Sequence, residues 1–173
     1  AFVCPVCNSF APFESRRCST CQAELRLHLP SQSMVATSDG AAIIDGAQWI
    51  ECTKSASLGC TWLVPEEQDK ALRGRCLADS LIRREPHADD TIAQEKLADT
   101  TTAMHRLVLQ LLDIGLPVDP FWRNEGGLAF DLLSSYSEGK PVTIGHADGV
   151  ITIDLVESLD AYRESLRVRL GEP

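Results

Sequence analysis

The clearest hydrophobic pattern in the chain lies between residues 89 and 115. Nonpolar positions recur there at three- and four-residue steps, which predicts one long amphipathic helix. Asp89 or Asp90 stands where an N-cap is expected, and Gly115 stands where a C-cap glycine is expected. The residues that make up this repeat are Ile92, Leu97, Thr100, Met104, Leu107, Val108, Leu111 and Ile114.

Three strand-like runs and a second helix are predicted after this helix. The runs span residues 128–133, 141–147 and 149–155. Nonpolar and polar residues alternate in the last run, as in a half-buried strand. The dipeptide Asp148-Gly149 predicts a tight hairpin turn before it, and the second helix is expected from about Leu159. The segment 88–173 is therefore expected to form helix, three strands and helix, an α+β arrangement with at least one antiparallel pair.

The first 87 residues show no long periodic run and contain all seven cysteines of the chain. Turn dipeptides at Asp39-Gly40 and Asp45-Gly46 predict a short hairpin. We therefore expect two small metal-stapled β modules, at residues 1–30 and 31–87, followed by the α+β portion at 88–173. Modules of this size bury too little apolar surface to fold unaided, so bound metal would supply folding energy.

The first cysteine set is the strongest chemical signal in the sequence. It consists of two Cys-x-x-Cys knuckles, "CPVC" (Cys4, Cys7) and "CSTC" (Cys18, Cys21). Two thiolates at this spacing in a tight turn can reach one tetrahedral ion, and two such turns complete a Cys4 zinc-ribbon site. Iron in a rubredoxin-like site is the competing interpretation.

The residue after each knuckle often needs a left-handed backbone. That residue is Asn8 in the first knuckle and Gln22 in the second; asparagine adopts this conformation at modest cost and glutamine less easily.

The second cysteine set has only three members, Cys52, Cys60 and Cys76. A closed structural zinc site needs four protein ligands. Asp79 stands where the second cysteine of a knuckle beginning at Cys76 would be, and it is the favoured fourth ligand. His87, beyond Pro86, and a water molecule are the alternatives. The sequence thus predicts two zinc ions, held by Cys4, Cys7, Cys18 and Cys21 and by Cys52, Cys60, Cys76 and Asp79.

Charge and composition narrow the functional classes. A formal net charge of -9 over 173 residues opposes a sequence-independent nucleic-acid binder, which needs Lys and Arg against phosphates. The sequence contains no run of about 18 apolar residues, so no membrane span is predicted. The chain has seven cysteines, several of them in Cys-x-x-Cys pairs, whereas a disulfide framework would have an even number. They indicate metal ligands in a reducing compartment, so a cytoplasmic protein is expected. A protein or peptide partner stays open, as does the oligomeric state.

The sequence contains no recognisable catalytic motif. It has no Gly-rich phosphate loop, no Gly-x-Ser-x-Gly elbow and no His-Glu-x-x-His helix. Isolated candidates are expected to be solvated or to have structural roles, with His105 at the surface or boundary of the long helix. These candidates are His105, His146, Asp119, Asp131 and Asp154.

Several stretches together resemble a known family. "CPVC…CSTC", "CTWLVP", "RCLADSLIRR", "HRLVLQLLDIGLPVDP", "GGLAFDLL" and "IGHADGVITIDLVESLDAYRESLRVRLGEP" are similar, in order, to the N-terminal part of bacterial zinc-binding metallopeptidases with an N-terminal zinc ribbon. The resemblance implies that residues 88–173 open a zincin-like domain, and that the family's His-Glu-x-x-His helix follows "GEP". It also implies a cysteine in many relatives where this chain has Asp79.

We therefore expect the N-terminal region of a zinc metallopeptidase, with structural zinc ribbons and no peptidase activity of its own. None of the family's catalytic residues can be assigned to a position of this chain. The alternative is a non-enzymatic zinc-ribbon adaptor that binds protein partners.

Overall fold

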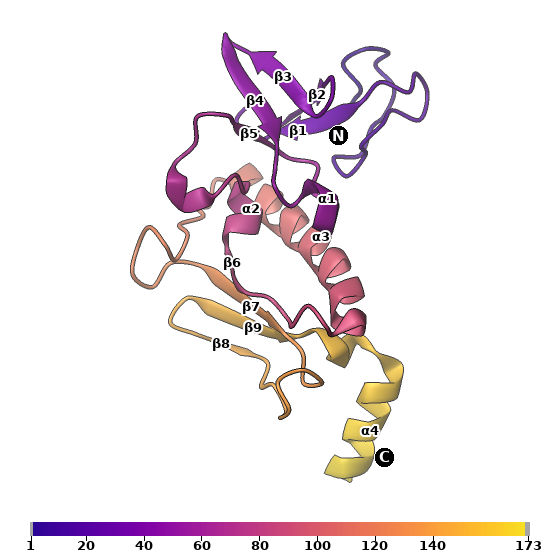
Figure 1. Cartoon of the computed structure of the whole chain (residues 1–173), viewed down its shortest axis with the longest axis vertical. Coiled ribbons are helices and arrows are strands. Elements are labelled where there is room, and N and C mark those ends of the chain that lie inside the picture. The colour runs from indigo at the N-terminus through magenta and orange to yellow at the C-terminus, as the bar shows by residue number, and fades with distance from the viewer. Residues whose placement is uncertain (1, 172–173) are drawn as a thin grey trace. The chain divides into compact units, whose positions relative to one another are not determined.

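A computed structural model of the chain describes residues 2–171 (Figure 1). The chain divides into two units, Ala1–Asp79 and Ser80–Pro173, and each is described separately below. The division into three modules stays a prediction. No helix within the described range is long and apolar enough to cross a membrane.

The first unit contains five short strands in two sheets. Strands β1 (Leu25–His28) and β2 (Ser33–Ala36) pair antiparallel in one sheet. Strands β3 (Ala41–Ile44), β4 (Ala47–Glu51) and β5 (Leu63–Pro65) form an antiparallel sheet in that order. The predicted Asp45-Gly46 turn joins β3 to β4, with both residues at positive φ. The expected hairpin in this region is confirmed.

Short helices connect these strands to the cysteine-bearing loops. Helix α1 (Ser55–Leu58) precedes β5, the 3-10 helix η1 (Lys70–Leu72) follows it, and α2 (Leu77–Ser80) comes last. The core of the unit gathers around the fully buried Trp62, which forms a parallel bridge with Leu27 of β1. Leu25, Leu58 and Val64 are buried with them.

The second unit is a four-stranded mixed sheet with helices. Its strands are β6 (Ile82–Arg84), β7 (Ala129–Leu133), β8 (Gly145–Ala147) and β9 (Val150–Asp154). They lie in the order β6-β7-β9-β8, with β6, β7 and β9 parallel and β8 antiparallel at one edge. All five residues of β7 are buried, as expected of a central strand with both faces covered.

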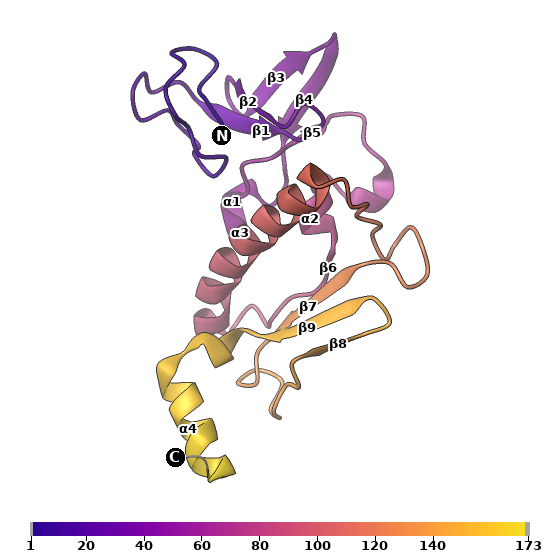
Figure 2. The same ribbon diagram turned by 180° about the vertical axis from the view of Figure 1, so that it is seen from behind.

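The predicted long helix is confirmed as α3 (Thr91–Asp113). Asp90 caps it, because its side chain accepts a hydrogen bond from the backbone N–H of Ala93, and Gly115 follows its end at positive φ. Figures 1 and 2 show α3 along one face of the sheet. Its face of buried residues includes Leu97, Met104 and Val108.

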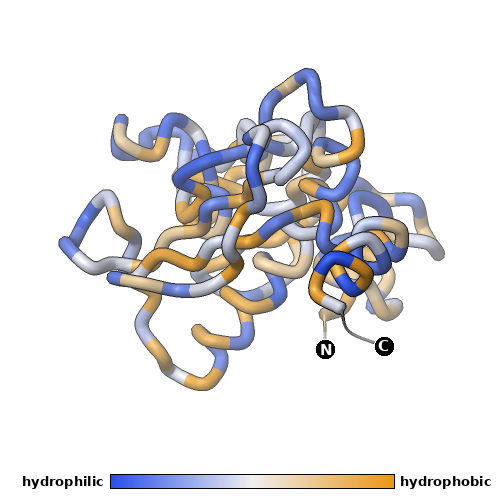
Figure 3. Tube along the Cα trace, turned by 90° about the horizontal axis from the view of Figure 1, so that it is seen from below, coloured by the Kyte–Doolittle hydropathy of each residue, from blue (hydrophilic) through white to orange (hydrophobic). Residues whose placement is uncertain are grey.

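The C-terminal helix α4 (Asp160–Leu170) begins after the 3-10 helix η2 (Leu155–Ser158). None of its described residues is buried, and Figure 3 shows hydrophilic and hydrophobic residues along it. Its docking includes a ring contact between Tyr162 and Tyr136, with centroids 5.6 Å apart.

The three strands predicted within residues 88–173 are present as β7, β8 and β9. The sheet also contains a strand that was not predicted, because Ile82–Arg84 joins it beside β7. That three-residue strand is too short for a periodic signal and is defined only by its long-range pairing. The strand predicted at 141–147 begins only at Gly145, since the preceding residues form no ladder. The predicted antiparallel pair is confirmed in β8 and β9.

Two candidate metal centres

The four cysteines of the first set lie together in the first unit. One sulfur from each brings all four ligand atoms within 4.8 Å of one another. The sulfurs of Cys4 and Cys21 are 3.6 Å apart, and those of Cys7 and Cys18 are 3.5 Å apart. Four sulfurs on a tetrahedron with a radius of about 2.3 Å would be about 3.8 Å apart, so the set fits a single zinc ion.

Both knuckles have the same backbone geometry. In the first, the N–H of Asn8 donates to the carbonyl of Cys4 at 2.9 Å; in the second, the N–H of Gln22 donates to that of Cys18 at 3.0 Å. Asn8 and Gln22 both have positive φ, 59° and 62°. The left-handed residue expected after each knuckle is therefore present, even where it is a glutamine.

The thiols of the first centre differ in acidity. Hydrogen bonds from the side chain and backbone of Ser9 lower the pKa of Cys7 to about 6. Ser9 is not among the residues predicted from the sequence, although a serine two residues after Cys7 is close enough to bond its thiol. Because zinc binds thiolates, a ligand that deprotonates near neutral pH favours metal capture.

The second centre brings together the three remaining cysteines and Asp79. Its four ligand atoms also lie within 4.8 Å of one another, and all four residues are buried. Oδ2 of Asp79 is 3.1 Å from the sulfur of Cys52 and 3.2 Å from that of Cys76. The sulfurs of Cys60 and Cys76 are 3.7 Å apart. Three sulfurs and one oxygen at these separations fit a tetrahedral ion.

Local structure explains how Asp79 reaches the second centre. Cys76 directly precedes the short helix α2, and Asp79 lies three residues later, in its first turn. The backbone N–H of Asp79 donates to the sulfur of Cys76, and that of Cys76 donates to the sulfur of Cys52. These bonds direct the backbone N–H groups of Cys76 and Asp79 toward the ligand sulfurs.

The second centre also contains one acidic thiol. Hydrogen bonds from the thiols of Cys60 and Cys76 lower the pKa of Cys52 to about 5. Burial raises the pKa of Cys76 above its usual value. A metal ion bound in place of the thiol protons would offset the free-energy cost of burying these thiolates, because burying unpaired polar groups is unfavourable.

His87, the alternative ligand, is not a member of this cluster. It lines a shallow hollow in the second unit with Asp89, Asp90 and Tyr136. No third group of metal-binding side chains gathers among residues 2–171.

The isolated candidates of the second unit do not converge on a catalytic arrangement. Asp131 is buried and accepts two hydrogen bonds from the guanidinium of Arg83, at 2.8 and 2.6 Å. Asp154 accepts hydrogen bonds from the backbone N–H groups of Ser135 and Val156. Both carboxylates therefore have structural partners, as expected.

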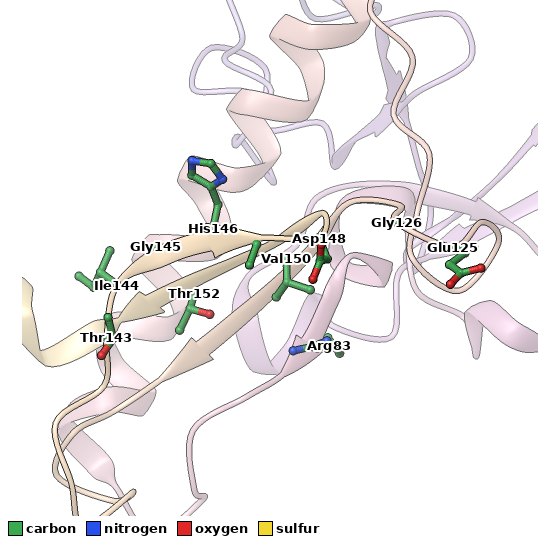
Figure 4. A pocket seen from close by; sticks show the side chains of 11 residues that line it. Arg83, Glu125, Gly126, Thr143, Ile144, Gly145, His146, Asp148, Val150 and Thr152 are labelled. Atoms are coloured by element: carbon green, nitrogen blue, oxygen red, sulfur yellow. The ribbon is translucent and has the colours of Figure 1, made fainter.

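The two histidines of the second unit differ from each other. His105 is 4% exposed, so the expectation of a surface or boundary position was wrong. His146 lies on β8 beside an open hollow of about 640 Å³. Figure 4 shows its side chain on the opposite side of the strand from Thr152, Val150 and Arg83, so these groups do not point toward one another.

Comparison with known proteins links both units to described families. Residues 1–89 match a family described as a zinc-ribbon domain, and residues 93–173 match one described as "putative zinc-binding metallo-peptidase". No solved structure matches the chain.

Curated relatives match along nearly the whole chain. Uncharacterized proteins of Mycobacterium bovis and of two strains of Mycobacterium tuberculosis are each 35% identical over 177 residues. The alignments cover 99% of this chain and 48% of each relative, so the chain spans about half the length of the curated relatives it matches. The order of ribbon and peptidase-family regions agrees with the resemblance in the sequence. The chain therefore belongs, over residues 1–89, to the zinc-ribbon family, and its residues 93–173 are similar to the family described as "putative zinc-binding metallo-peptidase".

Proposed function

We propose that residues 1–173 are the N-terminal region of a zinc metallopeptidase, in which two zinc ions have purely structural roles. The observation that carries this proposal is that each centre offers four protein donors. A catalytic zinc keeps one position open for water or substrate, whereas a structural zinc is closed by four protein ligands. Cys4, Cys7, Cys18 and Cys21 would hold one ion, and Cys52, Cys60, Cys76 and Asp79 the other.

The ions would supply folding energy, not reaction chemistry. Several core residues of the first unit are the cysteines themselves, and Cys4, Cys18, Cys52, Cys60 and Cys76 are all nearly inaccessible to solvent. A bound ion joins these thiolates into one packed unit. The carboxylate of the second centre favours zinc over iron there, because rubredoxin-like iron is bound by thiolates alone.

The second unit supports the peptidase half of the proposal. Its long helix and mixed sheet with an antiparallel edge strand agree with the expected opening of a zincin-like domain. The printed sequence contains no His-Glu-x-x-His, and the matched relatives are about twice as long. The catalytic residues would belong to a part of the full-length protein outside these 173 residues.

Two measurements test this function together. Elemental analysis of the purified chain should find two zinc ions, and peptidase assays with and without added zinc should find no activity. A longer polypeptide that includes a His-Glu-x-x-His segment should cleave peptides and lose activity when the glutamate is changed to glutamine. Metal-dependent proteolysis by residues 1–173 alone would contradict the proposal, as would a single bound zinc.

A non-enzymatic adaptor is the second candidate, and one observation favours it. Three apolar side chains beside the first knuckle are exposed: Val3 by 46%, Val6 by 62% and Phe10 by 65%. Apolar groups gathered at a surface are a common feature of protein-binding sites. A natural protein without a His-Glu-x-x-His segment that binds a protein through this surface would favour the adaptor. Under either function, the location proposed is the cytoplasm and nucleic acid is not the proposed partner.

A further inference from the structure

We propose that the two zinc centres are energetically coupled, so that an ion in the second centre raises the affinity of the first. This inference rests on the proposed function, since it requires two bound ions. The residues that carry it are Thr61 and Arg16, which would act as positioning residues for the first centre. Both connect the loop between the two knuckles (residues 8–17, the inter-knuckle loop) to the second centre.

The first connection is a buried hydrogen bond from Thr61. Its hydroxyl donates to the carbonyl of Phe13, in the inter-knuckle loop, at 2.7 Å, and Thr61 is 3% exposed. Thr61 directly follows Cys60, a ligand of the second centre. Its own carbonyl accepts from the N–H of Leu27 at 2.8 Å, so its backbone is held from β1 as well.

The second connection is made by Arg16. Its guanidinium donates to the hydroxyl of Ser55 at 2.6 Å and also to the carbonyl of the same residue. Ser55 begins helix α1, and its N–H donates to the carbonyl of Cys52 at 2.8 Å. The Ser55 hydroxyl donates in turn to the carboxylate of Glu51 at 2.8 Å. Arg16 therefore contacts a turn that begins at a ligand of the second centre.

The same loop determines the separation of the two knuckles. It runs from the residue after Cys7 to the residue before Cys18, so its conformation positions one pair of sulfurs against the other. The carbonyl of Arg16 accepts from the N–H of Leu25 at 2.8 Å, which ties the end of the loop to β1. Without the second ion, no metal joins Cys52 to Cys60. Thr61, which follows Cys60, and the turn after Cys52 that Arg16 contacts then lose their fixed positions.

The loop would then have to be ordered by the first ion alone. Ordering backbone costs free energy, and part of the affinity of the first ion would offset that cost. When the second centre is loaded, the loop is already held and the first ion binds more tightly. This is coupling between two sites in the thermodynamic sense, and it must be reciprocal.

A double-mutant cycle on the full chain tests the coupling. Cobalt(II) is the probe, because its absorption distinguishes a four-thiolate site from one with three thiolates and a carboxylate. Cys76→Ser breaks the second centre, and Thr61→Val combined with Arg16→Ala breaks both connections. We expect Cys76→Ser to weaken first-centre cobalt affinity by about 5- to 150-fold in the otherwise unchanged chain, the usual range for coupled sites.

In the chain without the connections, Cys76→Ser should change first-centre affinity less than about twofold. Thr61→Ser is the matched control, because it keeps the hydroxyl and should keep the coupling. An equal loss in both backgrounds would overturn the proposal, since it would report general unfolding and not the connections. No loss in the unchanged chain would overturn it as well.

Reciprocity provides an independent measurement. Cys7→Ser should weaken cobalt binding at the second centre by the same factor, and an unaffected second centre would contradict the coupling. The outcomes also separate this inference from the proposed function. A chain that binds two zinc ions without coupling refutes only the inference, whereas a chain that binds fewer than two refutes the proposed function.

Discussion

Oδ2 of Asp79 lies 3.2 Å from the sulfur of Cys76, three residues before it in the chain. A Cys-x-x-Asp pair thus takes the place of a Cys-x-x-Cys knuckle, with the carboxylate 1% exposed. Burial of a carboxylate is costly unless it is paired or bound to metal. The geometry accounts for the burial of Asp79 if the carboxylate serves as a ligand.

Substitution of Asp79 should therefore change zinc binding directly. We expect Asp79→Ala to weaken the second zinc by more than about tenfold, and Asp79→Cys to keep or tighten it, since thiolate is an equally good zinc ligand. Elemental analysis and competition with a chelator measure both effects. Asp69→Ala is a control in the same unit, because the Asp69 side chain is exposed and caps only η1. Unchanged zinc count and affinity in Asp79→Ala would remove Asp79 from the ligand set.

The ion pair of Arg83 with Asp131 should contribute more to stability than the adjacent ion pair formed by Arg84. The Asp131 side chain is 5% exposed and Arg83 holds both of its oxygens, whereas Arg84 and Glu138 form an ion pair with more of both side chains exposed. We expect Arg83→Ala to lower the free energy of unfolding by about 1–3 kcal/mol, because it leaves a buried carboxylate without this partner. Arg84→Ala should cost less than about 1 kcal/mol. Urea denaturation measures both, and equal losses would show that burial of Asp131 carries no penalty.

Two Asp-Gly turns allow a matched test of backbone space. Gly149 and Gly46 have nearly the same φ, 80° and 79°, but a Cβ on Gly149 would meet the carbonyl oxygen of Gly126 at 2.3 Å, whereas nothing lies within 4 Å at Gly46. Gly46→Ala should cost about 1–2 kcal/mol through its left-handed backbone. Gly149→Ala should cost a further 1–3 kcal/mol, roughly, through overpacking. Urea unfolding of the unit that carries each glycine measures the loss of stability in both variants. Equal losses would mean that the backbone at Gly126 can move away from the added methyl group without cost.

His28 should make the first unit sensitive to mild acid. It is 5% exposed, Nδ1 bonds the hydroxyl of Ser31 at 2.7 Å, and its ring packs against Trp49. Burial lowers the pKa of His28 in the folded chain, with a smaller opposing effect from Asp45. The unfolded chain therefore takes up a proton first as pH falls below about 6.5, and stability decreases toward the lower folded-state value.

Removal of this imidazole should flatten the pH dependence. We expect His28→Phe to lose less stability than the unchanged chain between about pH 7 and pH 5.5. Both chains should be saturated with zinc, so that acid release of the metal affects them equally. The urea midpoint at each pH is the measurement, and parallel pH profiles would show that His28 does not contribute.

Local features were well determined by the sequence alone. Cys-x-x-Cys spacing predicted the first sulfur cluster, and the gathering of Cys52, Cys60 and Cys76 in one short segment predicted the second. The 3.6-residue period predicted α3 within two residues at its start, and Asp45-Gly46 and Asp148-Gly149 predicted their turns. Each depends on residues close together in the chain, where backbone geometry restricts the choices. The proximity of Asp79 to the cysteines could also be proposed, because it too follows from a three-residue spacing.

Other features were decided only by the tertiary structure. Ile82–Arg84 becomes a strand because β7 lies beside it, and the segment has no periodicity of its own that would predict a strand. His105 is buried by the packing of α3, although its place in the helix suggested the boundary. The bond from Thr61 to Phe13 joins residues 48 positions apart. Such contacts depend on how distant segments pack, and spacing along the chain carries no information about them.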